Sequence, residues 1–415
     1  MALSWNEIQS KAIAFSKRWE AAHKEEAQAQ SFTTDFLRVF GVSDPEAIGD
    51  FEYKVPLSDG KMGYIDYVWK QPPPPAGGTP FEKGAGETSP LSAVAGIKGV
   101  SRSDGGLFIC GSDGAKIPAK NINPYLLEAP TVFIESRSKP ICDVPNMSLG
   151  NQPIDGGHYL FTAEEKEEFL KKEPQAEKWF RPWIGSHEFI NRYYRYFLFL
   201  KNCSPAELRT MPEAMKRVEA VKMFRLESNR EVTKQLAETP REFAFTNISD
   251  GTFIVVPEVS SERRRYIPIG FLTPEILCSN LVKIIPNATL YHFGILTSSV
   301  HMAWTRAVCG RLKSDYRYSN TLVYNNFPWP EAPDKEKATI EKLAQAVLGA
   351  RAVFSDSSLA DLYDPLTMPS ELLKVHQKLD RAVMKLYGFD PKTTELEIVA
   401  ELLGRYKELA DNDIK

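Results

Sequence analysis

No helix and no central strand of a sheet can run through the four consecutive prolines Pro72 to Pro75. Proline lacks the N–H group that a sheet ladder requires, and its ring breaks the interior of a helix. The sequence that follows, up to residue 106, is rich in proline and glycine and shows neither helical nor strand periodicity. We therefore predict a linker at residues 71–106, or the trace of a lost segment, between a short N-terminal piece and the rest of the 415-residue chain.

The N-terminal piece, residues 1–70, is predicted to hold two helices and a hairpin. Ser4 and Glu7 have the spacing of a capping box, and the segments FEYKVPL and GYIDYVWK flank the turn SDGKMG. No stretch resembles a signal peptide or approaches the roughly 20 apolar residues of a membrane span. The five cysteines are scattered without the spacing of a zinc site. We expect a cytoplasmic chain with reduced thiols, no metal centre and no membrane partner.

The rest of the chain predicts two further domains, so that the fold class is mixed α/β (α+β). Residues 107–330 alternate strand-like runs with polar helical stretches, of which TVFIES, YFLFL, GTFIVVP and AELRTMPEAMKRVEAVKMFRL are examples. Residues 331–415 carry apolar residues at helical spacing and predict a helical domain. In that domain Gly388 is expected to cap a helix and His376 to lie on the polar side of one.

Charge is unevenly distributed along the chain. Residues 251–320 contain eight Lys and Arg against four Asp and Glu, whereas residues 331–415 contain twelve against sixteen. Lys, Arg, Ser, Thr and Tyr side chains are the groups that hold phosphate backbones. The candidate contacts of this kind are Ser260, Ser261, Arg263, Arg264, Arg265, Tyr266, Arg306, Arg311 and Arg317. An ordinary solvated face would have the same composition, so the charge alone leaves both interpretations open.

The segment RLKSDYRYS places Lys313 and Asp315 two residues apart. If residues 311–318 form an extended strand, both side chains point to one side. A lysine can donate to O6 and N7 of guanine, and a carboxylate can accept from N4 of the paired cytosine. The two residues could therefore read one G·C pair, although a weak surface ion pair would also place them side by side.

Several long motifs follow one another in the order found in a known family. They are SRSKPICDVPNM, YIPIGFL, LYHFGILTSSVHMAWTRAVCGRL and RLKSDYRYSNTLVYNNFPWPE. They closely resemble the C-terminal part of the MmeI-like (type IIL) restriction–modification enzymes, and SWNEIQSKAIAFSKRW at the N-terminus resembles the start of the same enzymes. In that family one chain joins a nuclease, an adenine-N6 DNA methyltransferase, a target-recognition domain and a helical C-terminal region. The resemblance implies double-stranded DNA as a partner and phage defence as a context.

The resemblance also implies roles for single residues. In the family, the two positions that flank the serine of this motif vary with the base pair that is recognised. Carried onto this sequence they are Lys313 and Asp315, which favours base readout over a surface pair. By the same similarity, the segments from Ser260 to Tyr266 and from His301 to Arg311 are expected to line the DNA groove.

The catalytic motifs of the family are not found where the resemblance would place them. The nuclease resembles the PD-(D/E)xK type, which holds a divalent metal with an Asp on one strand and Glu-x-Lys on the next. Asp66 matches the Asp, but proline, alanine and glycine occupy the place of Glu-x-Lys, and Glu52-Tyr53-Lys54 lies upstream. We interpret Asp66 as a remnant of the nuclease motif and expect no Mg²⁺ site.

A methyltransferase needs a glycine-rich turn for S-adenosylmethionine and an N/D-P-P-Y/F loop for the flipped adenine. The segment GGLFICGSDG lacks the following helix and the acidic ribose partner, and Asn123-Pro124-Tyr125 lacks the second proline. We expect no catalytic residue and no cofactor in this chain. Three interpretations stay open: a DNA recognition module without a catalytic centre, a specificity component that acts with a separate methyltransferase or nuclease subunit, and a non-functional remnant.

Overall fold

The computed structural model describes residues 49–56, 62–69, 97–103, 106–111, 116–119, 129 and 132–413. The chain divides into two units, Met1–Ile122 and Asn123–Lys415. The second unit holds sheets and helices together with a helical C-terminal region, which confirms the mixed α/β fold class. Strands between residues 97 and 119 belong to the first unit, whereas the sequence placed residue 107 at the start of the second domain.

The first unit contains a hairpin and a small sheet. β1 (Gly49–Pro56) pairs antiparallel with β2 (Met62–Trp69), which confirms the predicted hairpin. β3 (Ile97–Ser103), β4 (Gly106–Gly111) and β5 (Lys116–Ala119) form an antiparallel sheet in that order. β3 lies within the predicted linker at residues 71–106, beyond the last proline of that segment, and pairs with the apolar GLFIC run. The two helices predicted in the first forty residues lie outside the described residues.

The second unit is built around three small sheets. The first sheet has the order β12 (Gly270–Leu272), β10 (Phe253–Pro257), β14 (Val282–Pro286) and β6 (Ser148–Leu149). The second has the order β13 (Leu277–Cys278), β8 (Phe180–Ile184), β9 (Arg195–Leu198) and β7 (Leu160–Phe161). The third has the order β11 (Val259–Ser260), β16 (Asp315–Arg317) and β15 (Gly310–Leu312). Every residue of β10 is buried, as expected for its run of apolar residues at the centre of a sheet.

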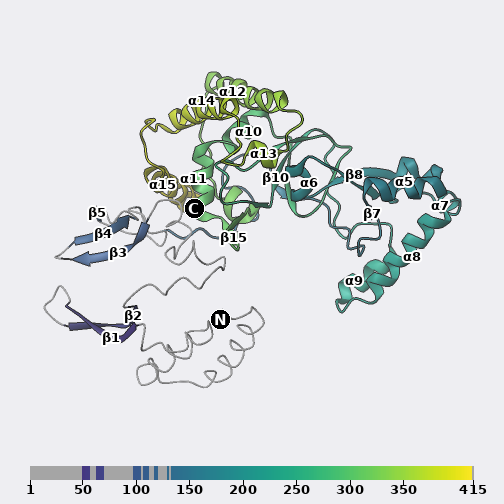
Figure 1. Ribbon diagram of the computed structural model, residues 1–415, viewed down its shortest axis with the longest axis horizontal. Coiled ribbons are helices and arrows are strands. Elements are labelled where there is room, and N and C mark those ends of the chain that lie inside the picture. Colours follow the sequence, from purple (N-terminus) through teal and green to yellow (C-terminus); the bar gives the residue numbers. More distant parts are fainter. Residues whose placement is uncertain are drawn as a thin grey trace. The chain divides into compact units, whose positions relative to one another are not determined.

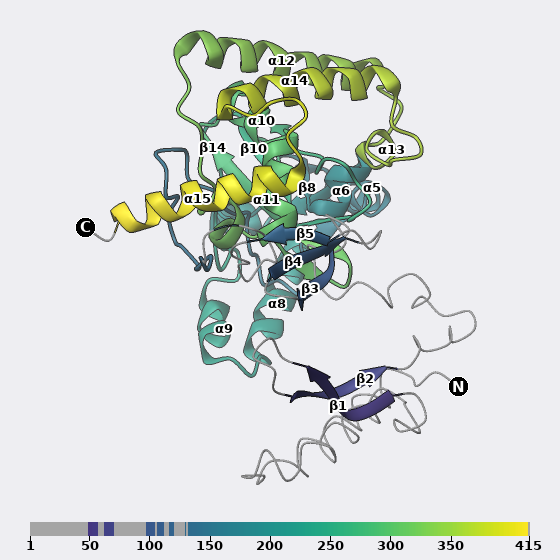
Figure 2. The same ribbon diagram turned by 90° about the vertical axis from the view of Figure 1, so that its left-hand side faces the viewer.

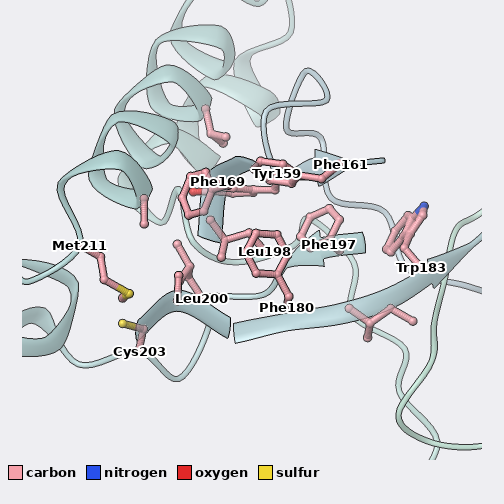
Figure 3. Packing of buried hydrophobic residues seen from close by; sticks show 14 of the residues in the cluster. Tyr159, Phe161, Phe169, Phe180, Trp183, Phe197, Leu198, Leu200, Cys203 and Met211 are labelled. Atoms are coloured by element: carbon pink, nitrogen blue, oxygen red, sulfur yellow. The ribbon is translucent and has the colours of Figure 1, made fainter. Parts of the chain in front are cut away.

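An aromatic core holds the second sheet against its helices (Figure 3). The helices of this region are α5 (Ala163–Lys172), α6 (Ser186–Asn191), α7 (Pro205–Leu208), α8 (Pro212–Leu226) and α9 (Glu231–Gln235). Figure 1 shows α5, α7, α8 and α9 at one end of this unit. Phe161, Phe169 and Phe180 pack edge to face with ring centroids 5.1 to 5.6 Å apart. Such pairs stabilise a core beyond the area that they bury.

The C-terminal helices cover α10 (Leu290–Leu296) and α11 (Ser299–Val308). They are α12 (Asp334–Val353), α13 (Leu359–Leu362), α14 (Ser370–Tyr387) and α15 (Glu395–Asp413). Figure 2 shows α12 and α14 side by side, with α15 beside α11. Gly388 ends α14 with φ of 83°, which confirms the predicted cap. His376 does not lie on a polar face, because α14 is covered on that side by Tyr266 and Tyr363 and the imidazole is fully buried. None of the helices in the described part of the chain combines the length and apolar character that crossing a bilayer requires.

The segment TVFIES, which was predicted to be a strand, forms no regular secondary structure over its described residues 132–136. This segment and the residues that follow it are hydrogen-bonded to residues 321–327. The Asn326 side chain donates to the carbonyl of Glu135 at 2.9 Å, and the Asn325 side chain donates to the carbonyl of Arg137 at 2.8 Å. Two buried asparagines therefore satisfy main-chain groups that a neighbouring strand would otherwise satisfy.

Arg225 of α8 is expected to be essential for the stability of this region. Its guanidinium is buried and donates to five main-chain carbonyls, those of Pro153, Ile154, Leu236, Thr239 and Glu242, at 2.7 to 2.9 Å. A buried carbonyl that is left without a hydrogen-bond donor destabilises the fold by about 1 to 3 kcal/mol. Arg225→Met should therefore lower the free energy of unfolding by about 3 kcal/mol or more. Urea denaturation measures this loss.

Lys222→Met on the same helix is the control, because Lys222 is exposed and its loss should change stability little. Equal stability of the Arg225→Met protein and the parent would contradict the assignment.

Candidate nucleic-acid interface

The third sheet brings together two segments that are far apart in the sequence. Val259 of β11 pairs with Arg317 of β16, and Ser260 pairs with Tyr316. β15 and β16 form a hairpin in which Leu312 faces Asp315 across a two-residue turn, Lys313 and Ser314. Residues 311–318 are therefore not one extended strand, so the condition under which Lys313 and Asp315 would point to one side of a strand is not met.

The hairpin turn explains this difference. Lys313 has φ of 57°, which is rare for a residue other than glycine. Two-residue hairpin turns need a positive φ at their first position, because only such turns match the twist of the flanking strands. Lys313 is exposed at the tip and Asp315 is partly buried at the start of β16. Within the described residues these two side chains do not form an ion pair with each other, so the alternative of a surface pair loses its support.

One face of the hairpin is packed and the other is open. Tyr316 is buried, its hydroxyl donates to the carbonyl of Glu262, and the Arg311 guanidinium lies 4.2 Å from the centre of its ring. Arg311 also donates to the carbonyl of Ser314 at 3.1 Å and so holds the turn. Because side chains alternate along a strand, Leu312, Asp315 and Arg317 lie on the opposite face. The open face thus carries an apolar, an acidic and a basic group beside the Lys313 tip.

The loop from Ser261 to Arg265, here called the arginine loop, lies beside this hairpin. The main-chain N–H of Glu262 donates to Oδ1 of Asp315 at 3.2 Å, and the Arg264 guanidinium donates to the hydroxyl of Ser260 at 3.4 Å. Burial lowers the pKa of Arg264, while Asp315 and Asp364 act in the opposite direction. Arg263 and Arg265 are exposed. Four exposed cations, Arg263, Arg265, Lys313 and Arg317, are therefore carried by two neighbouring segments.

Three of the residues predicted to contact a phosphate backbone are not at this surface. Tyr266 is fully buried against His376 and Asp380 of α14, and Ser260 on β11 is 2% exposed. Arg306 is engaged by the C-terminal region, since its guanidinium donates to both carboxylate oxygens of Glu395 on α15 at 2.7 and 3.0 Å.

The wider expectation that residues from His301 onward line a groove also fails for α11. Residues 301–305 and 307 of this helix are buried, and the His301 imidazole bonds to the Tyr318 hydroxyl at 2.8 Å. Burial lowers the pKa of His301 to about 3, so this imidazole is neutral and cannot act as a cationic phosphate contact.

Asp66, which we interpreted as a remnant of the nuclease motif, lies on β2 in the first unit.

Glu258 is a residue of this region that sequence reasoning did not identify. Its carboxylate accepts from Lys283 at 2.7 Å and from Arg317 at 3.0 Å. Lys283 is buried, so it needs this partner, whereas Arg317 stays largely exposed. The sequence offers little signal for the contact, because Lys283 comes from β14 and only the folded sheet brings it beside Glu258.

Three family models match the chain. They are the MmeI N-terminal domain over residues 10–72, the MmeI target recognition domain over residues 128–331 and the MmeI C-terminal domain over residues 332–413. The hairpin and the arginine loop both lie within the target recognition match.

Similar proteins match more than half of the chain. DNA methyltransferase A of Bacillus subtilis (strain 168) is 40% identical over 299 residues, which are 72% of this chain and 34% of that protein. The type IIL restriction–modification enzyme MmeI, solved in complex with DNA, is 45% identical with a TM-score of 0.69, over 72% of this chain and 40% of that chain. The type IIG restriction endonuclease BpuSI is 13% identical with a TM-score of 0.33, over 64% of this chain and 31% of that one, which is too distant to support an argument. The chain thus spans well under half the length of these relatives.

The Glu258 contacts predict a pH dependence of stability. Burial raises the pKa of this carboxyl, but the hydrogen bonds and charges of Lys283 and Arg317 outweigh burial and hold its pKa below the usual 4.5. A group with a lowered pKa in the folded state stabilises the fold above its unfolded pKa and loses that effect as the pH falls through the folded value. Glu258→Gln should therefore be less stable than the parent by roughly 1 to 2 kcal/mol at pH 7.

The difference between Glu258→Gln and the parent should narrow as the pH falls below about 4.5, as thermal unfolding at a series of pH values would measure. Glu401→Gln is the control, because its pair with Arg405 on α15 is about half exposed and contributes little. A difference that stays constant down to pH 3 would be inconsistent with this account.

Proposed function

This chain belongs to the MmeI family, and from that premise we propose that it is a sequence-specific double-stranded DNA recognition module of a restriction–modification or adenine-N6 DNA methyltransferase system. The observation that carries the proposal is that the hairpin and the arginine loop lie side by side and together carry four exposed cations, inside the segment matched by the target recognition domain. A relative of 45% identity was solved in complex with DNA, and a relative of 40% identity is named a DNA methyltransferase.

The arginine loop and Arg317 are proposed to hold the DNA backbone. Arginine presents a planar set of donors that suits a phosphate, and such contacts position a protein without reading sequence. Arg264 and Arg311 are half-buried and support the surface from beneath. Arg311 acts through Tyr316 and the turn carbonyl of Ser314, so its main role is to shape the tip.

Lys313 and Asp315 are proposed to read one G·C pair. The major groove admits a two-stranded β ribbon, and a two-residue turn is narrow enough to bring its tip to the base edges. Lys313 at the tip would donate to guanine, and the Asp315 carboxylate would accept from cytosine. The bond from Glu262 uses one of the two Asp315 oxygens and fixes the carboxylate at the base of the turn.

We further propose that the chain has no catalytic centre of its own and binds neither S-adenosylmethionine nor Mg²⁺. Only residues 73–127 separate the N-terminal match from the target recognition match, whereas the commonest size of an independent domain is roughly 100 to 150 residues. Its activity in a cell would then depend on a separate methyltransferase or nuclease subunit. Methyl transfer to DNA by the purified chain supplied with S-adenosylmethionine would refute this part.

Base readout is tested by selecting bound duplexes from a randomised DNA pool at roughly physiological salt. The parent should enrich a motif with a G·C position, and Lys313→Glu/Asp315→Arg should change or lose the preference at that position, at a cost of about 1 to 3 kcal/mol in discrimination. Lys313→Ala is the milder variant, because it leaves the Asp315 bond to Glu262 in place.

The matched control is Lys335→Glu/Asp356→Arg, which makes the same exchange at two exposed positions of the C-terminal region. An unchanged motif in the Lys313→Glu/Asp315→Arg protein would remove these two residues from the recognition scheme. A folded parent that enriches no motif would favour the non-functional remnant.

Backbone binding is tested by the dependence of affinity on salt. Each phosphate contact contributes about 0.9 to the slope of log affinity against log salt concentration, so Arg263→Ala/Arg265→Ala should lower that slope by about 2. The preferred sequence should not change, because phosphate contacts carry no base information. Lys171→Ala/Lys172→Ala on α5 removes the same charge from another exposed surface and should leave the slope unchanged. Equal slopes for both double variants would exclude the arginine loop from the interface.

A further inference from the structure

Tyr266 directly follows the arginine loop, and its side chain lies in the core. Its ring is fully buried and stacks on the imidazole of His376, with centroids 4.2 Å apart and an angle of 17° between the planes. Its hydroxyl donates to Oδ2 of Asp380 at 2.6 Å. His376 and Asp380 both lie on α14, which belongs to the segment matched by the C-terminal domain. The residue next to the exposed Arg265 is thus fixed by a different domain.

Asp380 also holds the recognition domain at a second point. Its Oδ1 accepts from the main-chain N–H of Ser299 at 2.7 Å, at the start of α11. The carboxyl is 5% exposed, and burial raises its pKa while the bonds from Tyr266 and Ser299 act in the opposite direction. One buried carboxyl of α14 therefore ties together the end of the arginine loop and the beginning of a core helix.

The contact between Tyr266 and His376 is part of a larger set of buried polar contacts. The Tyr363 hydroxyl bonds to His376 Nε2 at 2.7 Å and accepts from Arg351 Nε at 2.6 Å, and Arg351 also donates to the carbonyl of Ile269. All of these side chains are buried. In such a network the loss of one partner leaves the others without water or a substitute, so the arrangement is held in one geometry.

We propose that Tyr266 and Asp380 are positioning residues for DNA binding, through which the C-terminal helical domain sets the place of Arg263 and Arg265 although neither residue reaches the DNA. This inference rests on the proposed function. The arginine loop has two anchors: Glu262 is bound to the hairpin through Asp315 and Tyr316, and Tyr266 is bound to α14. The three arginines span the gap between these anchors, so a shift of the tyrosine displaces their main chain directly.

Tyr387 provides a matched comparison on the same helix. Its hydroxyl donates to the carbonyl of Pro328 at 2.9 Å, so it also makes a buried hydrogen bond from α14 to the recognition domain. Pro328 lies in the segment between η4 (Asn320–Tyr324) and α12, not in the arginine loop. Tyr387→Phe therefore removes another buried tyrosine hydrogen bond between α14 and the recognition domain without touching the loop.

The experiment compares Tyr266→Phe, Tyr387→Phe and the parent in affinity for a selected duplex over a range of salt concentrations, with thermal unfolding of each. Tyr266→Phe should weaken binding roughly tenfold, because arginines that are no longer held in place must be ordered when the DNA binds. It should also lower the salt slope by about 1 to 2, because the arginines lose their place on the phosphates. Tyr387→Phe should keep the affinity and the slope, even where it lowers stability by the same amount.

A double-mutant cycle separates positioning from general destabilisation. When Arg263→Ala/Arg265→Ala is already present, Tyr266→Phe should weaken binding no further, since the groups that it positions are gone. Amide hydrogen exchange in residues 262–265 should accelerate in Tyr266→Phe and not in Tyr387→Phe, in the absence of DNA. Asp380→Asn, which preserves the shape of the side chain, provides the same comparison if Tyr266→Phe fails to fold.

Additive effects in the cycle, or equal effects of Tyr266→Phe and Tyr387→Phe on affinity, would overturn the inference while the proposed function stands. A folded parent that binds no duplex would overturn the proposed function and this inference with it.

Discussion

The pairing of β11 with β16 is the contact on which the candidate interface depends. It places the arginine loop beside the hairpin tip, and it does so only while Tyr316 keeps the inner face of the sheet buried. Because side chains alternate along a strand, burial of Tyr316 on one face of β16 is enough to place Asp315 and Arg317 on the other face. The surface that we propose for DNA is therefore a consequence of what is packed beneath it, and its polar residues contribute little to holding it in place.

The acidic residues near this surface also stabilise the fold. Glu258 neutralises the buried Lys283, Asp315 accepts from the main chain of Glu262, and Asp380 binds Tyr266. Each carboxylate keeps a particular segment in position, and each is more buried than the four exposed cations Arg263, Arg265, Lys313 and Arg317. A net positive outer layer is thus supported by a negative inner layer, which allows several like charges to be held close together at limited cost.

Much of this organisation could be predicted from the sequence, and the failures have physical causes. The apolar run of β10 and the helical stripe of α14 were readable because burial is periodic in regular elements. The hairpin at Lys313 was not, since its turn lacks the Asn-Gly or Asp-Gly signal and takes a positive φ at a lysine. The burial of Tyr266 and His376 was missed because a tyrosine among arginines and a histidine among lysines look exposed until their partners from another domain are known.

The asparagine contacts between residues 135–137 and 321–326 bring the two ends of the target recognition segment together. Arg137 adds an ion pair to Asp413 near the end of α15. A domain that begins and finishes at one place can be carried by a host chain as a closed loop, because the flanking sequence need not span it. Under the proposed function, exchange of this segment at its joined ends would carry the target preference from one polypeptide to another while the rest of the recipient keeps its fold.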